Sequence, residues 1–147
     1  MKKLRLSLLD GSLKDEYQLI DINVKENEDI ISIFRGKIDL SELLDWFKDN
    51  EYEIKSSDFP IARASGESLA RAIRCFYENI NTEDDSLVDS MFDYRSRHCL
   101  RFGARGTLIP EVYIGKSGNK YEISKSDSND EWKYFIDIDD FFDHLKN

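Results

Sequence analysis

Three short runs near the start of the chain have the apolar patterns of β-strands. In the first two, 4–8 and 20–24, apolar residues alternate with polar ones, which is the period of a half-buried strand. The third run, 30–38, is more continuously apolar. Because only short polar segments separate the runs, the pattern predicts an antiparallel meander of three strands.

A helix is predicted to follow directly, in the segment IDLSELLDWFKDN (38–50). Asp39 is a candidate N-cap with Glu42 three residues on, a variant of the capping box, and Ile38 is placed to pack on Leu43 as a hydrophobic staple. Asn50 is predicted to end the helix. The apolar residues form one stripe along it: Leu40, Leu43, Leu44 and Phe47.

The end of the chain repeats this arrangement. Three more strands are predicted at 111–114, 120–124 and 132–136, and the segment IDIDDFFDHLKN (136–147) then begins a helix with Asp137 as its cap. A duplicated unit would give this likeness, and so would two helices that obey the same capping rules, since the upstream strands show no convincing identity. The predicted buried face of the last helix consists of Ile138, Phe141, Phe142 and Leu145.

The middle of the chain predicts two helices. Ser65 is a candidate N-cap for the first, whose apolar residues keep helical spacing as far as Ile80, and the second runs from about 85 to 95. The whole pattern predicts the α+β class: a largely antiparallel sheet built from two three-strand runs, each ending in a helix, with a central two-helix segment. A chain of 147 residues has the usual length of one domain, so we expect a single domain spanning 1–147.

The basic residues are unevenly distributed. The stretch 61–106 contains no lysine and balances seven arginines with seven acids, so the rest of the chain carries the whole net charge of −9. Arginine forms planar, bidentate pairs with carboxylates. We therefore predict that the arginines of this stretch form ion pairs with acids of the same stretch. The negative electrostatic field of the protein would then come mainly from the two strand-rich ends. The seven are Arg63, Arg71, Arg74, Arg95, Arg97, Arg101 and Arg105.

Composition limits the classes of function. An acidic chain is repelled at long range by nucleic acid and anionic lipid and is attracted to basic partners. The opening residues imitate a signal peptide, but Arg5 and Asp10 interrupt the apolar run. No stretch approaches the ~20 apolar residues of a membrane helix, and two cysteines do not make a disulfide framework. We expect a cytoplasmic protein that binds neither nucleic acid nor membrane.

Candidate chemistry is sparse. His98 and Cys99 are adjacent, but neighbouring residues on a strand point to opposite faces, so we interpret them as a partly buried cysteine beside a surface histidine. The histidines and cysteines do not have zinc-ligand spacing. The segment RSRHCLRFGARG (95–106) has the look of a basic patch with an interleaved aromatic residue, Phe102, yet nearby acids and the net charge argue against nucleic acid. We expect no catalytic, cofactor-binding or metal-binding residues.

In overall character the chain resembles the immunity proteins of bacterial toxin–immunity pairs, including those of contact-dependent inhibition systems. IDLSELLDWFKDN and the two strand-rich ends carry the likeness. The resemblance implies a non-catalytic protein that binds and neutralises a basic, nuclease-like toxin. The acids expected to face such a partner are Asp139, Asp140 and Asp143 on the last helix and, as a second choice, Glu83, Asp84, Asp85 and Asp89.

Two other classes of function remain open. A regulatory or scaffold domain would use an exposed sheet edge or an exposed cluster of Trp46, Phe47 and Phe142. An enzyme would need a site that sequence reading does not assemble, for example a pocket lined by His98, Arg101 and Glu111.

Overall fold

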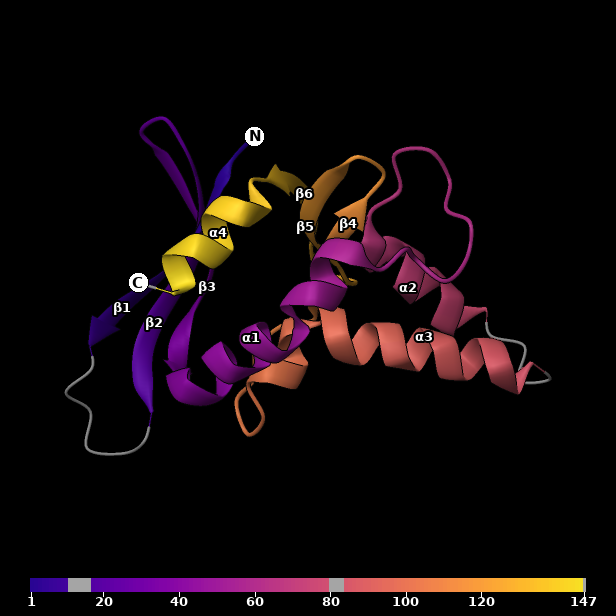
Figure 1. Cartoon of the computed structure of the whole chain (residues 1–147), viewed down its shortest axis with the longest axis horizontal. Helices are drawn as coiled ribbons and strands as arrows, with labels where there is room; N and C mark the ends of the chain where they lie inside the picture. The colour runs from indigo at the N-terminus through magenta and orange to yellow at the C-terminus, as the bar shows by residue number, and fades with distance from the viewer. Residues whose placement is uncertain (11–16, 80–83, 147) are drawn as a thin grey trace.

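The computed structural model describes residues 1–10, 17–79 and 84–146. It contains two antiparallel sheets of three strands, each followed by a helix, and a central helical segment, which confirms the predicted α+β class (Figure 1). The strands are β1 (Lys3–Asp10), β2 (Gln18–Glu26) and β3 (Asp29–Ile38) in one sheet, and β4 (Val112–Ser117), β5 (Lys120–Ser126) and β6 (Glu131–Ile136) in the other. The helices are α1 (Leu40–Ser56), α2 (Leu69–Glu78), α3 (Asp85–His98), the short 3₁₀ turn η1 (Leu100–Gly103) and α4 (Ile138–Leu145).

The predicted caps of α1 and α4 are confirmed. The carboxylate of Asp39 accepts a hydrogen bond from the backbone N–H of Glu42, and Asp137 does the same for Asp140, each at 3.1 Å. Helix α1 runs six residues beyond its predicted end. Asn50 is buried within the helix, and its side-chain amide donates a hydrogen bond to the carbonyl of Trp46 at 2.9 Å. Because the helix backbone itself provides this hydrogen bond, the helix continues past Asn50.

The two sheets meet at the N-terminus. The backbone N–H of Lys2 donates to the carbonyl of Phe135, and the N–H of Asp137 donates to the carbonyl of Lys2, both at 3.0 Å. These bonds hold β1 beside the end of β6. Helices α1 and α4 then cover the main core, where the ring of Phe47 meets Phe141 edge-on with centroids 5.1 Å apart.

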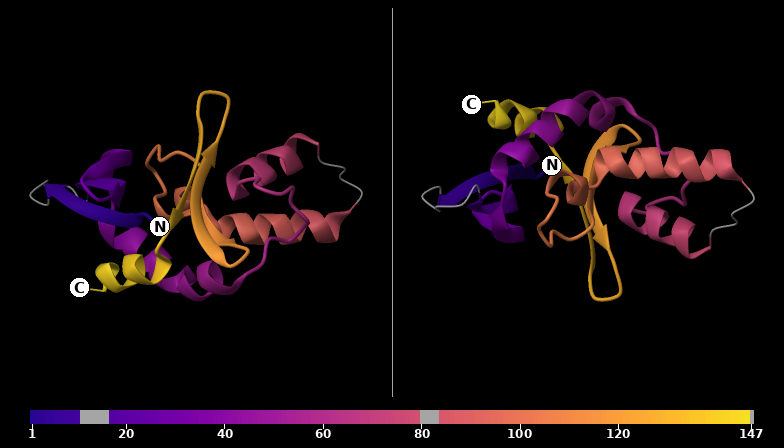
Figure 2. Two further views of the ribbon diagram at one scale, coloured as in Figure 1. Left: turned by 90° about the horizontal axis from the view of Figure 1, so that it is seen from above. Right: turned by 90° about the horizontal axis from the view of Figure 1, so that it is seen from below.

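The molecule is extended along one direction. The first sheet lies at one end, the second sheet in the middle, and α2 and α3 beyond it at the other end, an order seen in both Figure 1 and Figure 2. A second apolar cluster joins α2 and α3 to β4. It contains Leu69, Ala70, Ile73, Met91, Tyr94, Cys99 and Tyr113. In the described part of the chain, no helix is both long and apolar enough to cross a membrane.

Helix α2 begins on two buried polar side chains of β5. The N–H of Leu69 donates to the carboxylate of Glu122 at 3.0 Å, and the N–H of Ala70 donates to the hydroxyl of Ser124 at 3.2 Å. Glu122 and Ser124 are fully buried. The cap is Ser68, whose hydroxyl accepts from the N–H of Arg71, so the predicted start at Ser65 is wrong by one turn. Ile80, predicted to extend this helix, lies outside the described residues.

We predict that Glu122→Ala lowers the free energy of unfolding by about 3–5 kcal/mol, because it removes the partner of the Leu69 N–H and of Arg63, whose guanidinium lies 3.5 Å from this carboxylate. Glu122→Gln keeps the volume and one acceptor, so we expect a smaller loss of about 1–3 kcal/mol. Urea denaturation measures both. Glu131→Gln, the same change at the exposed first residue of β6, is the control and should stay within about 0.5 kcal/mol of wild type. Equal losses in all three variants would contradict the assignment.

Candidate functional site

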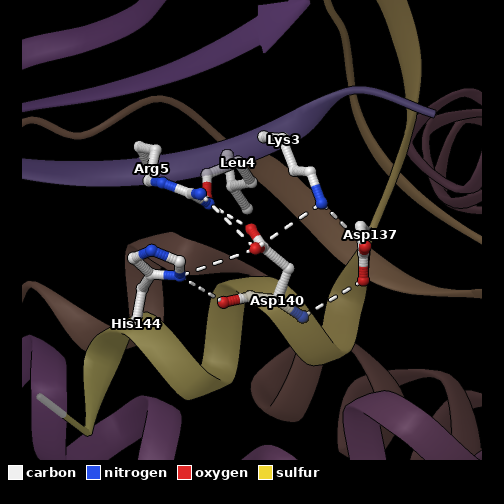
Figure 3. A network of polar contacts seen from close by, with 6 residues as sticks. All are labelled: Lys3, Leu4, Arg5, Asp137, Asp140 and His144. Carbon is white, nitrogen blue, oxygen red and sulfur yellow. Dashed lines mark hydrogen bonds and ion pairs between the residues drawn. The ribbon is translucent and has the colours of Figure 1, made fainter.

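Asp140 of α4 and the cap residue Asp137 are paired with cations of β1 (Figure 3). Arg5 donates to the carboxylate of Asp140, and Lys3 lies 3.6 Å from the same carboxylate while it donates to Asp137 at 3.1 Å. The side chain of Asp140 is only 18% exposed. Asp140, predicted to face a partner, therefore ties the last helix to the first strand.

The pKa values of these groups follow from the pairing. The hydrogen bond from Arg5 lowers the pKa of Asp140, and the N–H of Asp140, followed by Lys3, lowers the pKa of Asp137. The bond to Asp137 in turn raises the pKa of Lys3. The carboxylates stay charged at neutral pH, and the cations beside them reduce the field that they send into solvent.

The other predicted acids are more exposed. Asp139 is 79% exposed and lies 3.0 Å from Lys55 of α1, and Asp143 is exposed and also has an interaction partner. On α3, Asp84 caps the helix through the N–H of Leu87, while Asp85 and Asp89 are exposed. The structure does not bring the α3 acids into the hollows described below. Glu83 lies outside the described residues.

A hollow of about 480 Å³ lies on the outward face of α1. Four carboxylates from the cap and the first three turns of the helix line it, and none of the four forms an ion pair with another described residue. Trp46 and Phe102 add two aromatic rings, and Ser41 and Arg105 complete the lining. The carboxylates are those of Asp39, Glu42, Asp45 and Asp49.

The far wall of this acidic hollow comes from η1 and the residues after it. The N–H of Arg105 donates to the carboxylate of Glu42 at 3.2 Å, and the indole N–H of Trp46 donates to the carbonyl of Ser96 at 3.2 Å. A Cβ atom placed on Gly103 would lie 2.8 Å from Leu43, so the chain approaches α1 as closely as glycine allows. The spacing of the acids on one helix face is visible in the sequence; the contribution of 102–105 is not.

The prediction that the arginines of 61–106 pair within that stretch is wrong for most of them. Among the residues that the structure describes in this stretch, only Arg74 with Glu78 and Arg97 with Asp93 do so. Four others reach acids of the second sheet and the residue before it: Arg63 pairs with Glu122, Arg71 with Glu131, and Arg95 and Arg101 both with Glu111. The central segment therefore neutralises acids that the sequence assigned to the acidic end.

His98 is not on the surface, contrary to our interpretation, and both it and Cys99 are fully buried. Its ring stacks on Tyr94 at 3.8 Å, and its nitrogens lie 2.8 Å and 3.3 Å from the carbonyls of Tyr94 and Glu53. Burial lowers the pKa of His98 and raises that of Cys99 to about 11. The thiol is therefore protonated at neutral pH, whereas a nucleophilic cysteine acts as a thiolate.

The residues suggested for an enzyme site and for an exposed aromatic cluster are not brought together in the structure. Arg101 and Glu111 meet at 3.3 Å, but His98 points to the carbonyls of α1 and α3 and does not join them. Phe47 and Phe142 are buried, so they form no exposed aromatic cluster with Trp46. Among the residues that the structure describes, no group of three or more His, Cys, Asp or Glu side chains is arranged to hold a metal ion.

Comparison with known proteins adds no relative: no family model, no curated protein sequence and no solved structure matches this chain.

The burial of His98 predicts a pH dependence of stability. Its pKa in the folded protein lies below the ordinary 6.5, so the unfolded chain binds the proton more readily. Stability is therefore complete above about pH 6.5 and falls as the pH drops below it. Urea denaturation between about pH 7.5 and pH 5 should show this fall, and His98→Gln should flatten it. His144→Gln, the same change at the exposed histidine of α4, should keep it; a slope unchanged in His98→Gln would refute the assignment.

Proposed function

We propose that this protein is a non-catalytic binding protein, an immunity protein that binds and neutralises a basic, nuclease-like toxin. The observation that carries the proposal is the acidic hollow on α1, in which four carboxylates without ion-pair partners among the described residues surround two aromatic rings. Its chemistry suits the side chain of a lysine or arginine on a partner protein.

Three physical effects favour a basic occupant. The clustered carboxylates attract a cationic surface and raise the rate of encounter, an effect that falls with ionic strength. The rings of Trp46 and Phe102 line the hollow, and an aromatic ring stabilises a cation that lies over its face, as Phe102 does for Arg95 at 5.8 Å from its centroid. Asp45 and Asp49 stand four residues apart on the exposed helix face, so the repulsion between them is relieved when a positive group binds there.

A reducing, cytoplasmic location agrees with the thiols. Cys75 and Cys99 are both free, as is usual in the cytoplasm, where glutathione keeps thiols reduced. An immunity protein of a toxin that acts on intracellular nucleic acid has to meet that toxin in the same compartment.

A scaffold function is the second candidate, and one observation favours it. Strand β3 is at an edge of the first sheet, and Ile30 on it is 61% exposed. An exposed edge strand with apolar side chains is able to pair with a strand of another chain. The β2–β3 pairing also shifts register between Ile22 and Asn23, a bulge of the kind that discourages edge pairing. The toxin-binding proposal therefore has the stronger support.

Affinity capture from the native host with tagged protein, eluted in salt rising from about 50 mM to about 500 mM, tests the proposal. We expect one basic protein that leaves the column only at high salt, because charge attraction holds it. That protein should have a toxic activity which the tagged protein abolishes. Recovery of only the protein itself would favour the scaffold function, and a partner whose binding is unchanged by salt would exclude the electrostatic mechanism.

Three double variants, each with two acids neutralised, locate the contact surface on the same partner. We expect Asp45→Asn/Asp49→Asn on α1 to slow association about tenfold or more at low salt and to speed dissociation, since it removes carboxylates at the centre of the contact. Asp85→Asn/Asp89→Asn on α3 and Asp139→Asn/Asp143→Asn on α4 change the net charge equally and serve as matched controls. Surface plasmon resonance measures both rates; a larger effect in either control would move the interface to that helix.

A further inference from the structure

A second hollow of about 580 Å³ adjoins the acidic one at Phe102 and Arg105, which line both. The loop between η1 and β4 forms most of it, and Arg95 of α3 closes one side. The residues that matter for its chemistry are Arg95, Arg101, Phe102, Arg105, Thr107 and Leu108. We call this the arginine-rimmed hollow.

The wall of the arginine-rimmed hollow is apolar and exposed. The side chain of Leu108 is 97% exposed, and Phe102 meets Phe92, itself 54% exposed, edge-on with centroids 6.1 Å apart. The loop is held by its own bonds: the N–H of Thr107 donates to the carbonyl of Ala104 at 3.3 Å, and Arg101 donates to the carbonyl of Ile109 at 3.1 Å. Leu108 is thus fixed in solvent next to the buried Ile109. Covering an apolar group held in this way stabilises a complex.

The rim is positively charged although the chain is acidic. Arg95 and Arg101 both form an ion pair with Glu111, so a single negative charge is shared between two positive ones. Arg105 is exposed, and its guanidinium forms no ion pair with another of the residues that the structure describes. No carboxylate lines the hollow itself. The three guanidinium groups of the rim thus have one carboxylate partner, Glu111, and Arg105 stands between this apolar wall and the four carboxylates of the acidic hollow.

We propose that the arginine-rimmed hollow docks an acidic peptide segment of a partner protein, with one bulky apolar side chain against Leu108 and Phe102 and carboxylates on Arg101 and Arg105. Arginine and aromatic side chains are enriched at the centres of interfaces, and here exposed arginines lie beside the half-buried ring of Phe102. Nucleic acid fits less well, because the net charge of −9 repels a strand with a phosphate at every nucleotide more strongly than it repels a short peptide segment with two carboxylates. This binding does not depend on the proposed toxin.

Selection from a randomised peptide library on the immobilised full chain tests the inference and does not require the partner to be identified. The selected peptides should carry aspartate or glutamate on both sides of a leucine or an aromatic residue. The same library is selected in parallel on Arg105→Glu/Leu108→Ser, where this class should disappear. Enrichment of basic peptides, of no class, or of the same acidic class on both proteins would overturn the proposal.

Fluorescence anisotropy with one selected peptide then gives the contribution of each group. We expect about tenfold weaker binding for Leu108→Ser and for Arg105→Glu, the loss that one anchor residue gives. Ile30→Ser and Arg71→Glu make the same changes at exposed sites on β3 and α2 and should bind as wild type does, which also reports correct folding. Asp45→Asn/Asp49→Asn should keep the peptide even if toxin binding fails. A labelled single-stranded oligonucleotide that displaces the peptide would instead identify a nucleic-acid site.

Discussion

The buried carboxylate of Glu122 is the interaction on which the second half of the molecule depends. A buried charge is tolerated only when hydrogen bonds and an opposite charge satisfy it. Arg63 and the N–H of Leu69 meet that requirement, and in doing so they fix the start of α2 over β5. With α2 in place, α3 packs beside it through the cluster of Met91 and Tyr94. The chain then leaves α3 where η1 packs on α1, and this close approach at Gly103 forms the acidic hollow.

Local rules predicted the elements well, and interactions distant in sequence account for the errors. The aspartate caps at 39 and 137 act on backbone groups three residues away, so the sequence contains all the information needed to place them. The cap at Ser68 could not be preferred over Ser65 from the sequence, because Glu122 and Ser124 select it from more than fifty residues away. The prediction that Asn50 ends α1 was wrong for a similar reason. Tertiary packing buries the side chain of Asn50, whose amide group therefore donates a hydrogen bond to the helix backbone and not to solvent.

The candidate sites divide in the same way. The acids of α1 lie on one face by helical spacing alone, although the partner-binding acids were predicted on the last helix and at 83–89. What turns the face into a hollow is Phe102 and Arg105, about sixty residues later, and no periodicity connects them to α1. The number of charges in a segment also does not show which of its acids form ion pairs in the folded protein. Asp140 belongs to a strongly acidic segment, 137–143, yet Arg5 and Lys3, at the opposite end of the chain, pair with it.

The two hollows share Phe102 and Arg105, and this shared wall restricts what either can bind. A uniformly basic surface that entered the acidic hollow would bring positive charge against Arg105, and like charges placed together weaken a contact by an amount that rejects wrong partners. A partner that carries a cation for the α1 acids and, next to it, a carboxylate for Arg105 meets no such repulsion. For a partner of the kind proposed, the alternation of charge across one aromatic residue selects for a matching pattern of charge and for one orientation of binding.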